Sequence, residues 1–198
     1  MIPILRPTIA NINLNALKRN ILKARTIIAT RNNKNNLANN TKIFLLVKAN
    51  AYGHDAQKIA TYVQKENLVD FLGVASIEEG LILRQNGINL PILVLGSIFP
   101  FDCFEWAIKN KLSIAVASVK AAKALVKIAE ELKITAMAHI KQETGMGRIG
   151  SRRPSAMEIL RILSSSYFVK VEGVFSHFAC ANVDDNYSQQ QIAYFKEF

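Results

Sequence analysis

FLLVKANAYGH, at residues 44–54, is the stretch that decides how the fold of this chain is interpreted. An apolar run of strand length delivers Lys48 into a polar turn that contains a glycine. Lysine is rarely fully buried unless it is paired or reactive, because burial disfavours the ammonium form. A strand-end lysine in an apolar mouth can therefore present a nucleophilic amine, whereas a lone lysine after an apolar run is more commonly just solvated. The neighbours of Lys48 in the fold must separate these two interpretations.

Strand-like and helical segments alternate along the whole chain. Short buried strands that alternate with amphipathic helices predict a parallel sheet covered by helices, either open and doubly wound or closed into a barrel. The turn after the first strand lacks GxGxxG, and GxxxxGK[ST] occurs nowhere, so a nucleotide-binding fold is disfavoured. The predicted strands, each in its own βα unit, are residues 43–47, 71–75, 92–95, 112–116, 135–141 and 169–175.

Local signals predict where helices begin and where a loop interrupts them. Asn13 or Asn15 is a candidate N-cap for the first helix, and Ser76-x-x-Glu79 has the form of a capping box. Residues 30–41 are rich in Asn and Lys and nearly free of apolar side chains. We expect them to form a mobile loop.

Composition limits the class of protein. The chain has 198 residues, half of them apolar, which suits one domain or one domain and part of another. Its net charge of +10 comes from lysines scattered over the helices, without a compact basic stripe, so we expect no nucleic-acid partner. No apolar run is long enough for a secretory signal or a membrane span, so a cytoplasmic location without membrane contact is expected. Cys103 and Cys180 have no CxxC spacing, and no set of metal ligands stands out.

The unusual residues follow particular strands. Lys48 and Tyr52 come after the first strand, Lys141 and the glycine-rich residues 143–150 come at the end of the fifth, and His177 comes after the sixth. In parallel α/β folds the carboxyl ends of the strands build the active site. We therefore expect these groups to converge on one cavity.

Each of these side chains also has an ordinary structural interpretation. Tyr52 can cover a turn, and Arg148 can pair with Glu143 or cap a carbonyl group. A single strand-end histidine such as His177 is more often a hydrogen-bonded structural residue than a ligand. Only their occurrence together favours a functional site.

Three motifs in this order resemble those of alanine racemases. VKANAYGH at residues 47–54 is similar to their pyridoxal-phosphate attachment motif, and KQETGMGRIG at 141–150 is similar to a second signature. SHFA at 176–179 is similar to a third. The resemblance extends over essentially the whole chain, with further similar segments at residues 6–8, 12–17, 73–79 and 91–96.

The resemblance implies an incomplete (β/α)8 TIM-type barrel. About six βα units are present, and the C-terminal β domain of the family is absent, so we expect the chain to be truncated. Residues 1–14 would form an N-terminal strand segment that pairs with the absent domain. Residues 15–198 would form a partial pyridoxal-phosphate-binding barrel. The full-length enzyme is expected to be a homodimer.

The resemblance also implies a role for each site residue. Lys48 would form the Schiff base with pyridoxal 5'-phosphate and then act as the acid/base on one face, removing the α-proton of D-alanine. Tyr52 would hydrogen-bond the phosphate, and His177 would pack against the pyridine ring. Arg148 would bind both the cofactor phenolate and the substrate carboxylate, which suits its permanently charged fork. Lys141 matches a lysine that is carbamylated in many members of the family.

The implied reaction is the interconversion of L-alanine and D-alanine, which supplies D-alanine for cell-wall peptidoglycan. It needs a proton-transferring group on each face of the substrate, and Lys48 serves only one. The second group, a tyrosine that the family donates across the dimer, has no match in this chain. We therefore expect the 198-residue chain alone to racemise alanine little or not at all. Two positions depart from the usual motifs: Glu143 replaces an Asp, and Asp55 replaces a Gly.

Three other interpretations remain open. One is a noncatalytic pyridoxal-phosphate-binding barrel of the cofactor-homeostasis type, which shares the Schiff-base lysine. Another is a fold-related amino-acid decarboxylase, and the last is a decayed racemase remnant. The form of residues 143–150 favours a racemase over the first two.

Overall fold

The computed structural model describes residues 9–34 and 40–198 of the chain. Most of the predicted N-terminal segment, residues 1–8, and the middle of the predicted loop, residues 35–39, lie outside the described residues. Residues 9–13 belong to no helix or strand, and the first helix begins at Leu14. The pairing of residues 1–14 with another domain therefore stays a prediction.

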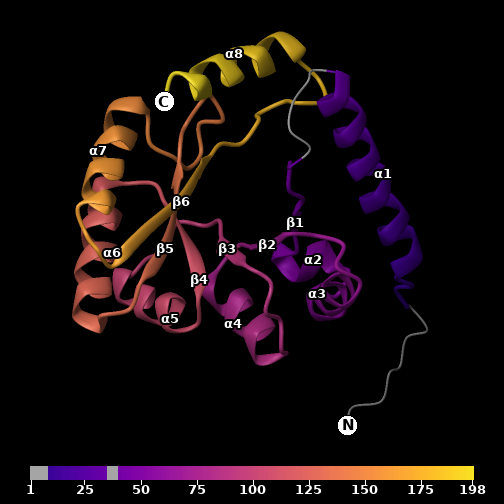
Figure 1. Cartoon of the computed structure of the whole chain (residues 1–198), viewed down its shortest axis with the longest axis horizontal. Coiled ribbons are helices and arrows are strands. Elements are labelled where there is room, and N and C mark those ends of the chain that lie inside the picture. Colours follow the sequence, from indigo (N-terminus) through magenta and orange to yellow (C-terminus); the bar gives the residue numbers. More distant parts are fainter. Residues whose placement is uncertain (1–8, 35–39) are drawn as a thin grey trace.

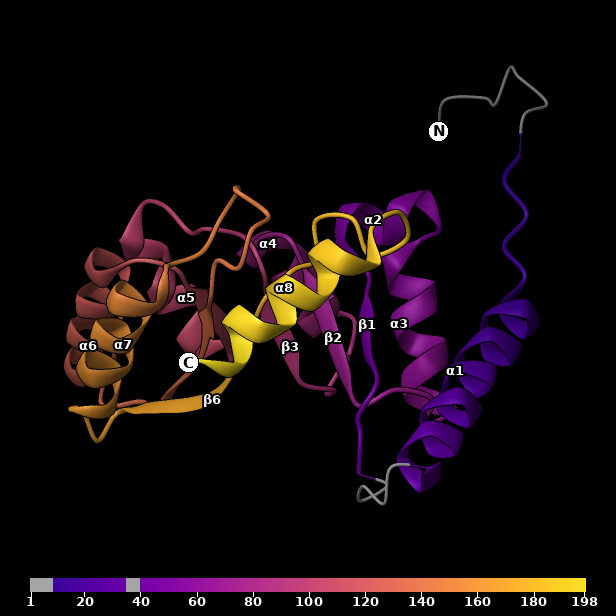
Figure 2. The ribbon, with the colours of Figure 1, turned by 90° about the horizontal axis from the view of Figure 1, so that it is seen from above.

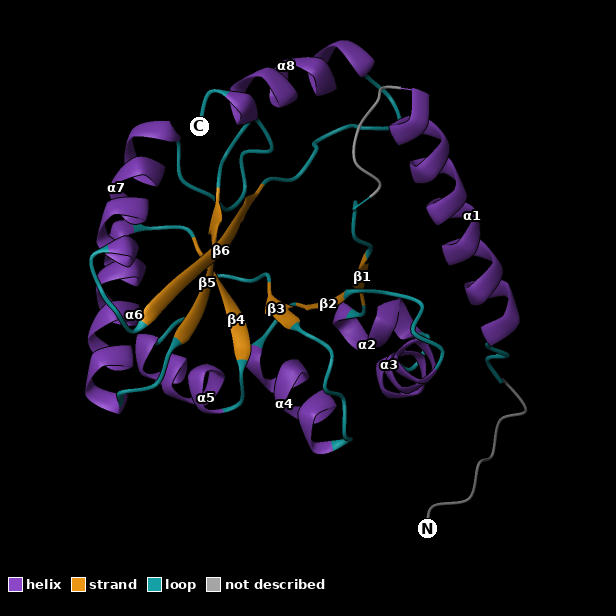
Figure 3. Ribbon diagram, in the orientation of Figure 1, coloured by secondary structure: helices purple, strands orange, loops and turns teal. Residues whose placement is uncertain are grey.

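A single parallel sheet of six strands forms the centre of the fold, as predicted from the alternating pattern (Figure 3). The strands are β1 (Phe44–Leu46), β2 (Phe71–Val74), β3 (Ile92–Val94), β4 (Leu112–Val116), β5 (Ala136–Lys141) and β6 (Val169–Phe175). The helices are α1 (Leu14–Lys34), α2 (Lys48–Gly53), α3 (Ala56–Lys65), α4 (Ile77–Gln85), α5 (Phe104–Lys109), α6 (Val119–Leu132), α7 (Arg153–Ser164) and α8 (Asp185–Lys196), with a 3-10 turn, η1 (Phe101–Cys103), before α5.

The strand order decides between the two predicted architectures. The strands pair as β1-β2-β3-β4-β5-β6, each with its successor in the chain. A doubly wound sheet reverses its strand order at a switch point, whereas a barrel keeps chain order. The fold is therefore the barrel type, with the helices arranged around the outside of the fanned strands (Figure 1). Among the described residues β1 and β6 are the two edge strands, and α8 lies between α7 and α1 in the surrounding helices (Figure 2).

The hydrophobic core lies between the sheet and the helices. Strand β5 illustrates how the sequence divides its two faces: Ala136, Ala138 and Ile140 are fully buried, while Met137 and His139 between them are only partly buried. Strand β4 is buried at all of its residues, as expected for a central parallel strand. The largest fully buried side chains include Leu72, Phe104, Ile114, Leu125, Ile140 and Ile159. None of the helices in the described part of the chain combines the length and apolarity needed to cross a membrane.

Helix α1 corrects part of the loop prediction. It continues through Lys34, so residues 30–34 are helical rather than part of a loop. The Thr30 hydroxyl donates to the Thr26 carbonyl oxygen at 2.9 Å, within the helix, and basic Arg31 and Lys34 in the last turn suit the negative end of the helix dipole. Asn13, not Asn15, caps the start of this helix by accepting from the Ala16 N–H at 2.9 Å.

We predict that Phe104→Ala lowers the free energy of unfolding by about 3–5 kcal/mol, because it empties a fully buried aromatic site. Phe104 is 1% exposed and stacks on Phe101 with 5.6 Å between ring centroids. Trp106→Ala is the matched control, since Trp106 lies on the same helix but is 61% exposed. Equilibrium urea unfolding measures both. Equal losses for the two variants would contradict the assignment of this core.

Candidate active site

The predicted site residues gather at one edge of the sheet. Lys48 begins α2 directly after β1 and Val47, and Lys141 is the last residue of β5. Arg148 lies in the loop between β5 and α7, and His177 follows the end of β6 by two residues. All strands are parallel, so these positions share the carboxyl edge. The groups are close enough for Lys48, Lys141 and Arg148 to affect the protonation of His177.

The turn after Lys48 has an unusual backbone. The residues from Ala49 to Tyr52 all have φ between 50° and 53°, so α2 is a left-handed turn. Left-handed conformation costs an L-residue roughly 1–2 kcal/mol, and such strain persists only where the surroundings enforce it. The turn leaves the Tyr52 ring beside the lysine, with Lys48 Nζ 5.9 Å from the ring centroid. The turn therefore places an aromatic ring next to the amine.

Glu79 fastens this turn to the next strand. Its Oε1 accepts from the Ala49 N–H at 2.7 Å, and its Oε2 accepts from the Ala75 N–H at 2.6 Å. The capping-box prediction was therefore half right: Ser76 accepts from the Glu79 N–H at 3.4 Å, but the Glu79 side chain bonds elsewhere. One carboxylate joins the carboxyl ends of β1 and β2 next to Lys48.

Two other side chains hold the rest of the turn. Asn50 Oδ1 accepts from the Ala56 N–H at 2.9 Å, which ties the turn to the start of α3. His54 Nδ1 lies 2.9 Å from the Ala51 carbonyl oxygen, so it donates there as the Nδ1-protonated tautomer. His54 thus orients the turn. Asp55, at the position where the motif usually has Gly, takes a φ of 67° and accepts from the Lys58 N–H as the N-cap of α3.

The buried amine at this edge belongs to Lys141 rather than to Lys48. Lys141 is 6% exposed, whereas Lys48 is partly buried. Burial lowers the pKa of Lys141, and the nearby charges of Arg148 and Lys48 lower it further, against an opposing effect of Glu143. The Lys141 Nζ lies 5.4 Å from the centroid of the Phe175 ring. A lysine in this environment carries more neutral amine at a given pH than a solvated one.

The loop that carries Arg148 leaves the end of β5 and returns beside it. Ser151 N–H donates to the Lys141 carbonyl oxygen at 2.9 Å, and Glu143 N–H donates to the Ser151 carbonyl oxygen at 3.0 Å. Gly150 makes this close return possible: its φ is 145°, and a Cβ there would lie 2.8 Å from Glu143 N. The base of the loop is therefore fixed beside β5, and Arg148 is exposed on the part of the loop that extends from it.

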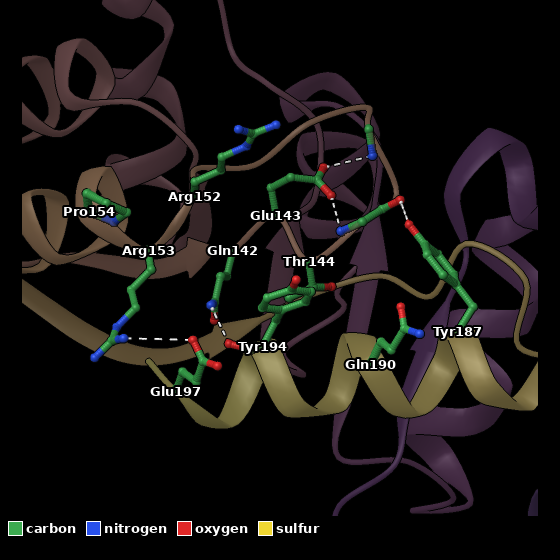
Figure 4. Close-up of a pocket in the computed structure, with 12 residues that line it drawn as sticks. Gln142, Glu143, Thr144, Arg152, Arg153, Pro154, Tyr187, Gln190, Tyr194 and Glu197 are labelled. Carbon is green, nitrogen blue, oxygen red and sulfur yellow. Dashed lines mark hydrogen bonds and ion pairs between the residues drawn. The ribbon is translucent and has the colours of Figure 1, made fainter.

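Glu143 organises the loop through its backbone. Its carboxylate accepts from the Gly145 N–H and, at 3.0 Å, from the Gly147 N–H (Figure 4). Burial tends to raise the pKa of Glu143, but these hydrogen bonds outweigh it and lower the pKa below the usual value. Glu143 thus holds the loop through its backbone N–H groups, that of Arg148 included.

The edge carries an excess of positive charge. Burial lowers the pKa of His177, and the neighbouring Arg148, Lys141 and Lys48 lower it further. His177, Arg148 and Tyr52 are exposed, so their side chains are available to a ligand. The neighbouring cations suit an anionic ligand. The partly buried amine beside an aromatic ring suits a ligand that bears a reactive carbonyl group.

A separate hollow of about 640 Å³ lies between this loop, the start of α7 and helix α8 (Figure 4). It is lined by residues such as Gln142, Arg152, Tyr187 and Tyr194, but not by Lys48, Lys141, Arg148 or His177. The side chains with catalytic potential therefore do not line this hollow, and we place the candidate site at the strand ends.

Sequence patterns missed several residues that shape this edge. Glu79 was recognised only as a capping residue, Thr144 and Ser176 lie inside two of the recognised motifs but were given no role of their own, and Gln191 carried no pattern at all. The structure links the last three by hydrogen bonds between the loops that follow β5 and β6. The only signal in the sequence is that Thr144 belongs to the motif at residues 141–150 and Ser176 to the motif at residues 176–179.

Comparison with known proteins gives one consistent family. The model of the alanine racemase N-terminal domain matches residues 12–198. Alanine racemase of Symbiobacterium thermophilum is 37% identical over 189 residues, which cover 95% of this chain and 47% of that protein. Alanine racemase of Streptococcus pyogenes serotype M28 is 35% identical over 196 residues, covering 97% of this chain and 49% of that protein. The chain thus spans about half the length of the curated relatives it matches.

Solved structures agree with the sequences. The alanine racemase structure from Clostridium difficile 630 matches with a TM-score of 0.84 and 38% identity, over 98% of this chain and 49% of that one. The alanine racemase structure from Bacillus anthracis matches with a TM-score of 0.81 and 33% identity, over 99% of this chain and 48% of that one. The six-stranded α/β sheet thus corresponds to the N-terminal, TIM-barrel-like domain of these enzymes, and the chain belongs to the alanine racemase family.

Proposed function

We propose that the protein to which this chain belongs interconverts L-alanine and D-alanine with pyridoxal 5'-phosphate. Because the chain spans about half of its relatives, we assign to it the cofactor site and one of two proton-transferring groups. One observation carries the proposal: Lys48 is held at the end of β1, beside Tyr52 and near Lys141, Arg148 and His177. The whole enzyme would work in the cytoplasm and supply D-alanine for peptidoglycan.

The residues present fit this cofactor. Pyridoxal phosphate has an aldehyde, which suits a lysine amine, and a phosphate and a phenolate, which suit surrounding cations. Tyr52 is exposed and its ring lies beside Lys48, so its hydroxyl can donate to the phosphate. When bound, the cofactor would supply the electron sink that makes the α-proton of an amino acid removable.

Each side chain would then have a distinct task. Lys48 would move a proton between its Nζ and the substrate Cα on one face. Arg148 would bind the substrate carboxylate and the cofactor oxygen with two N–H groups at once, which a lysine cannot do with the same geometry. His177 would pack on the cofactor ring and shield it from water. The strained turn and the Glu79 carboxylate would keep Lys48 in place.

Racemisation also needs a group on the opposite face. By analogy with the family this would be a tyrosine from a second subunit, so we propose a homodimeric enzyme. The structure from Clostridium difficile 630 exists as a complex with cycloserine, and the one from Bacillus anthracis has bound L-Ala-P. These ligands of related proteins support a small amino-acid substrate.

We predict that borohydride reduction of the chain with pyridoxal phosphate leaves a covalent adduct on Lys48. The adduct should disappear in Lys48→Ala, because the trapped bond needs the amine. Peptide mapping by mass spectrometry measures its position. The matched control is Lys120→Ala, which removes an exposed lysine on α6 and should keep the adduct. An adduct spread over surface lysines in both variants would contradict the assignment.

We predict that the chain with the cofactor exchanges the Cα proton of D-alanine in D2O faster than that of L-alanine. The reason is that Lys48 would serve one face only. Proton NMR of each enantiomer measures the exchange, and Lys48→Ala corrects for exchange by the free cofactor. A trapped adduct without exchange of either enantiomer would instead favour the noncatalytic pyridoxal-phosphate-binding barrel.

We further propose that Lys141 is a carbamylation site, in which the neutral amine adds to CO2 and releases one proton. Its burial and its lowered pKa support this reactivity. The resulting carboxylate would compensate the charge of Arg148 and Lys48. Mass spectrometry in bicarbonate should reveal a labile adduct on Lys141, and its absence would count against the modification.

We predict that, in CO2-free buffer, Lys141→Met is more stable than the parent chain at neutral pH. The pKa of Lys141 is lowered in the folded state, so the unfolded state binds more protons between the folded and unfolded pKa values. The free energy of unfolding of the parent chain therefore rises with pH in that window. The difference in free energy of unfolding between Lys141→Met and the parent chain should shrink as the pH rises. Urea unfolding between neutral pH and the usual lysine pKa measures this. Lys123→Met, at an exposed lysine on α6, should show no such trend, and a gap independent of pH would refute the explanation.

A further inference from the structure

We propose that Gln191 is a positioning residue that fixes the Arg148 loop and the His177 loop relative to each other. This inference rests on the proposed function, in which both residues contact the cofactor. Gln191 lies on α8, outside the three recognised motifs, and its side chain is 2% exposed.

The Gln191 amide joins the two loops directly. Its Nε2 donates to Thr144 Oγ1 at 3.0 Å and to the His177 carbonyl oxygen at 3.0 Å. Its Oε1 accepts from the Ala179 N–H at 2.9 Å. Thr144 belongs to the loop after β5, whereas His177 and Ala179 belong to the segment after β6. Both donor hydrogens and the acceptor of one buried side chain are thus used to connect segments that are far apart in sequence.

A chain of hydroxyl groups continues from this amide. The hydroxyls of Thr144 and Ser176 lie 2.7 Å apart, and Ser176 donates to the Gln142 carbonyl oxygen at 2.9 Å. Because Ser176 is the donor to Gln142, Thr144 donates to Ser176. The direction of each bond in the network is therefore set, and Gln191 is its first donor. Such connected, buried networks restrict their members to one arrangement.

Other residues of α8 hold the same loop (Figure 4). The Tyr187 hydroxyl donates to the Gly145 carbonyl oxygen at 2.8 Å, and Gln142 Nε2 donates to the Tyr194 carbonyl oxygen at 3.1 Å. Tyr187 and Gln191 are four residues apart, so they lie on one face of the helix. At Gly145 the φ is 135° and a Cβ would lie 2.5 Å from Tyr187 Oη, so the contact requires glycine. Helix α8 therefore acts as a clamp on the Arg148 loop.

The network would fix where Arg148 and His177 lie without taking part in the reaction itself. Arg148 follows Thr144 by four residues, and the His177 carbonyl is itself a partner of Gln191. Both functional side chains are exposed, so their own packing does little to fix them. A ligand that touches both needs the two loops at one distance, and small displacements of binding groups are costly.

The test replaces Gln191 with Met, which keeps length and volume but removes all three hydrogen bonds. Gln189→Met, at an exposed position on the same helix, is one control. Ile159→Val, in the buried core of α7, is a second control that lowers stability away from the site. We expect the dissociation constant of pyridoxal phosphate, from absorbance titration, to rise roughly ten-fold in Gln191→Met. It should change less than about two-fold in both controls, while borohydride still traps the adduct on Lys48.

Hydrogen exchange without the cofactor gives an independent readout. In Gln191→Met the backbone amides of residues 143–150 and 176–179 should exchange faster together, and those of α7 should not. The inference would be overturned if these amides exchanged no faster in Gln191→Met than in Ile159→Val. It would also be overturned if the two variants bound the cofactor with equal affinity. If the parent chain binds no cofactor, the proposed function fails, and coupled exchange of the two loops still decides the role of Gln191.

A milder variant covers the case in which Gln191→Met does not fold. Tyr187→Phe removes one hydrogen bond, to Gly145, and leaves the Gln191 amide intact. It should weaken cofactor binding by about three-fold and accelerate exchange in residues 143–150 alone. Faster exchange in both loops, or in neither, would contradict the clamp.

Discussion

The constraint on which the rest of this structure depends is that its six strands are parallel and pair in the order of the chain. Each connection between consecutive strands must then return the chain to the opposite end of the sheet, and every strand ends at the same edge. The first and last strands are at opposite margins, yet Lys48 after β1 affects the protonation of His177 after β6. The curvature of the sheet is thus what turns a row of strand ends into one site.

At that edge the backbone is held in conformations that it would not adopt alone. Four consecutive residues after Lys48 are left-handed, and Gly150 closes the loop back onto β5. In both places a carboxylate supplies acceptors for backbone N–H groups: Glu79 for Ala49 and Ala75, and Glu143 for Gly145 and Gly147. Buried or strained N–H groups need such partners, because leaving them unpaired costs free energy. Side chains from neighbouring elements therefore make the local strain tolerable.

The carboxyl edge of the sheet carries an excess of positive charge. Lys48, Lys141 and Arg148 raise the positive potential around His177, at a place where Lys141 is also buried. Such an arrangement is unfavourable without an anion, and it lowers the pKa of both Lys141 and His177. Membership of the alanine racemase family and this charge distribution are consistent with the same proposal of an anionic cofactor.

The alternation of strands and helices, the lysine at the end of β1 and the three motifs at strand ends could all be predicted from the sequence, because these features depend on local apolar patterns and short spacings. It did not predict that α1 continues through Lys34, where helical hydrogen bonds prevail over polar composition. Three features became visible only in the folded chain: the buried amine is Lys141, Glu79 supports the turn of Lys48, and Gln191 joins two loops. These contacts join residues that are separated along the chain, by 30 positions for Glu79 and Ala49, 47 for Gln191 and Thr144, and 14 for Gln191 and His177, and such contacts leave no periodic signal in the sequence.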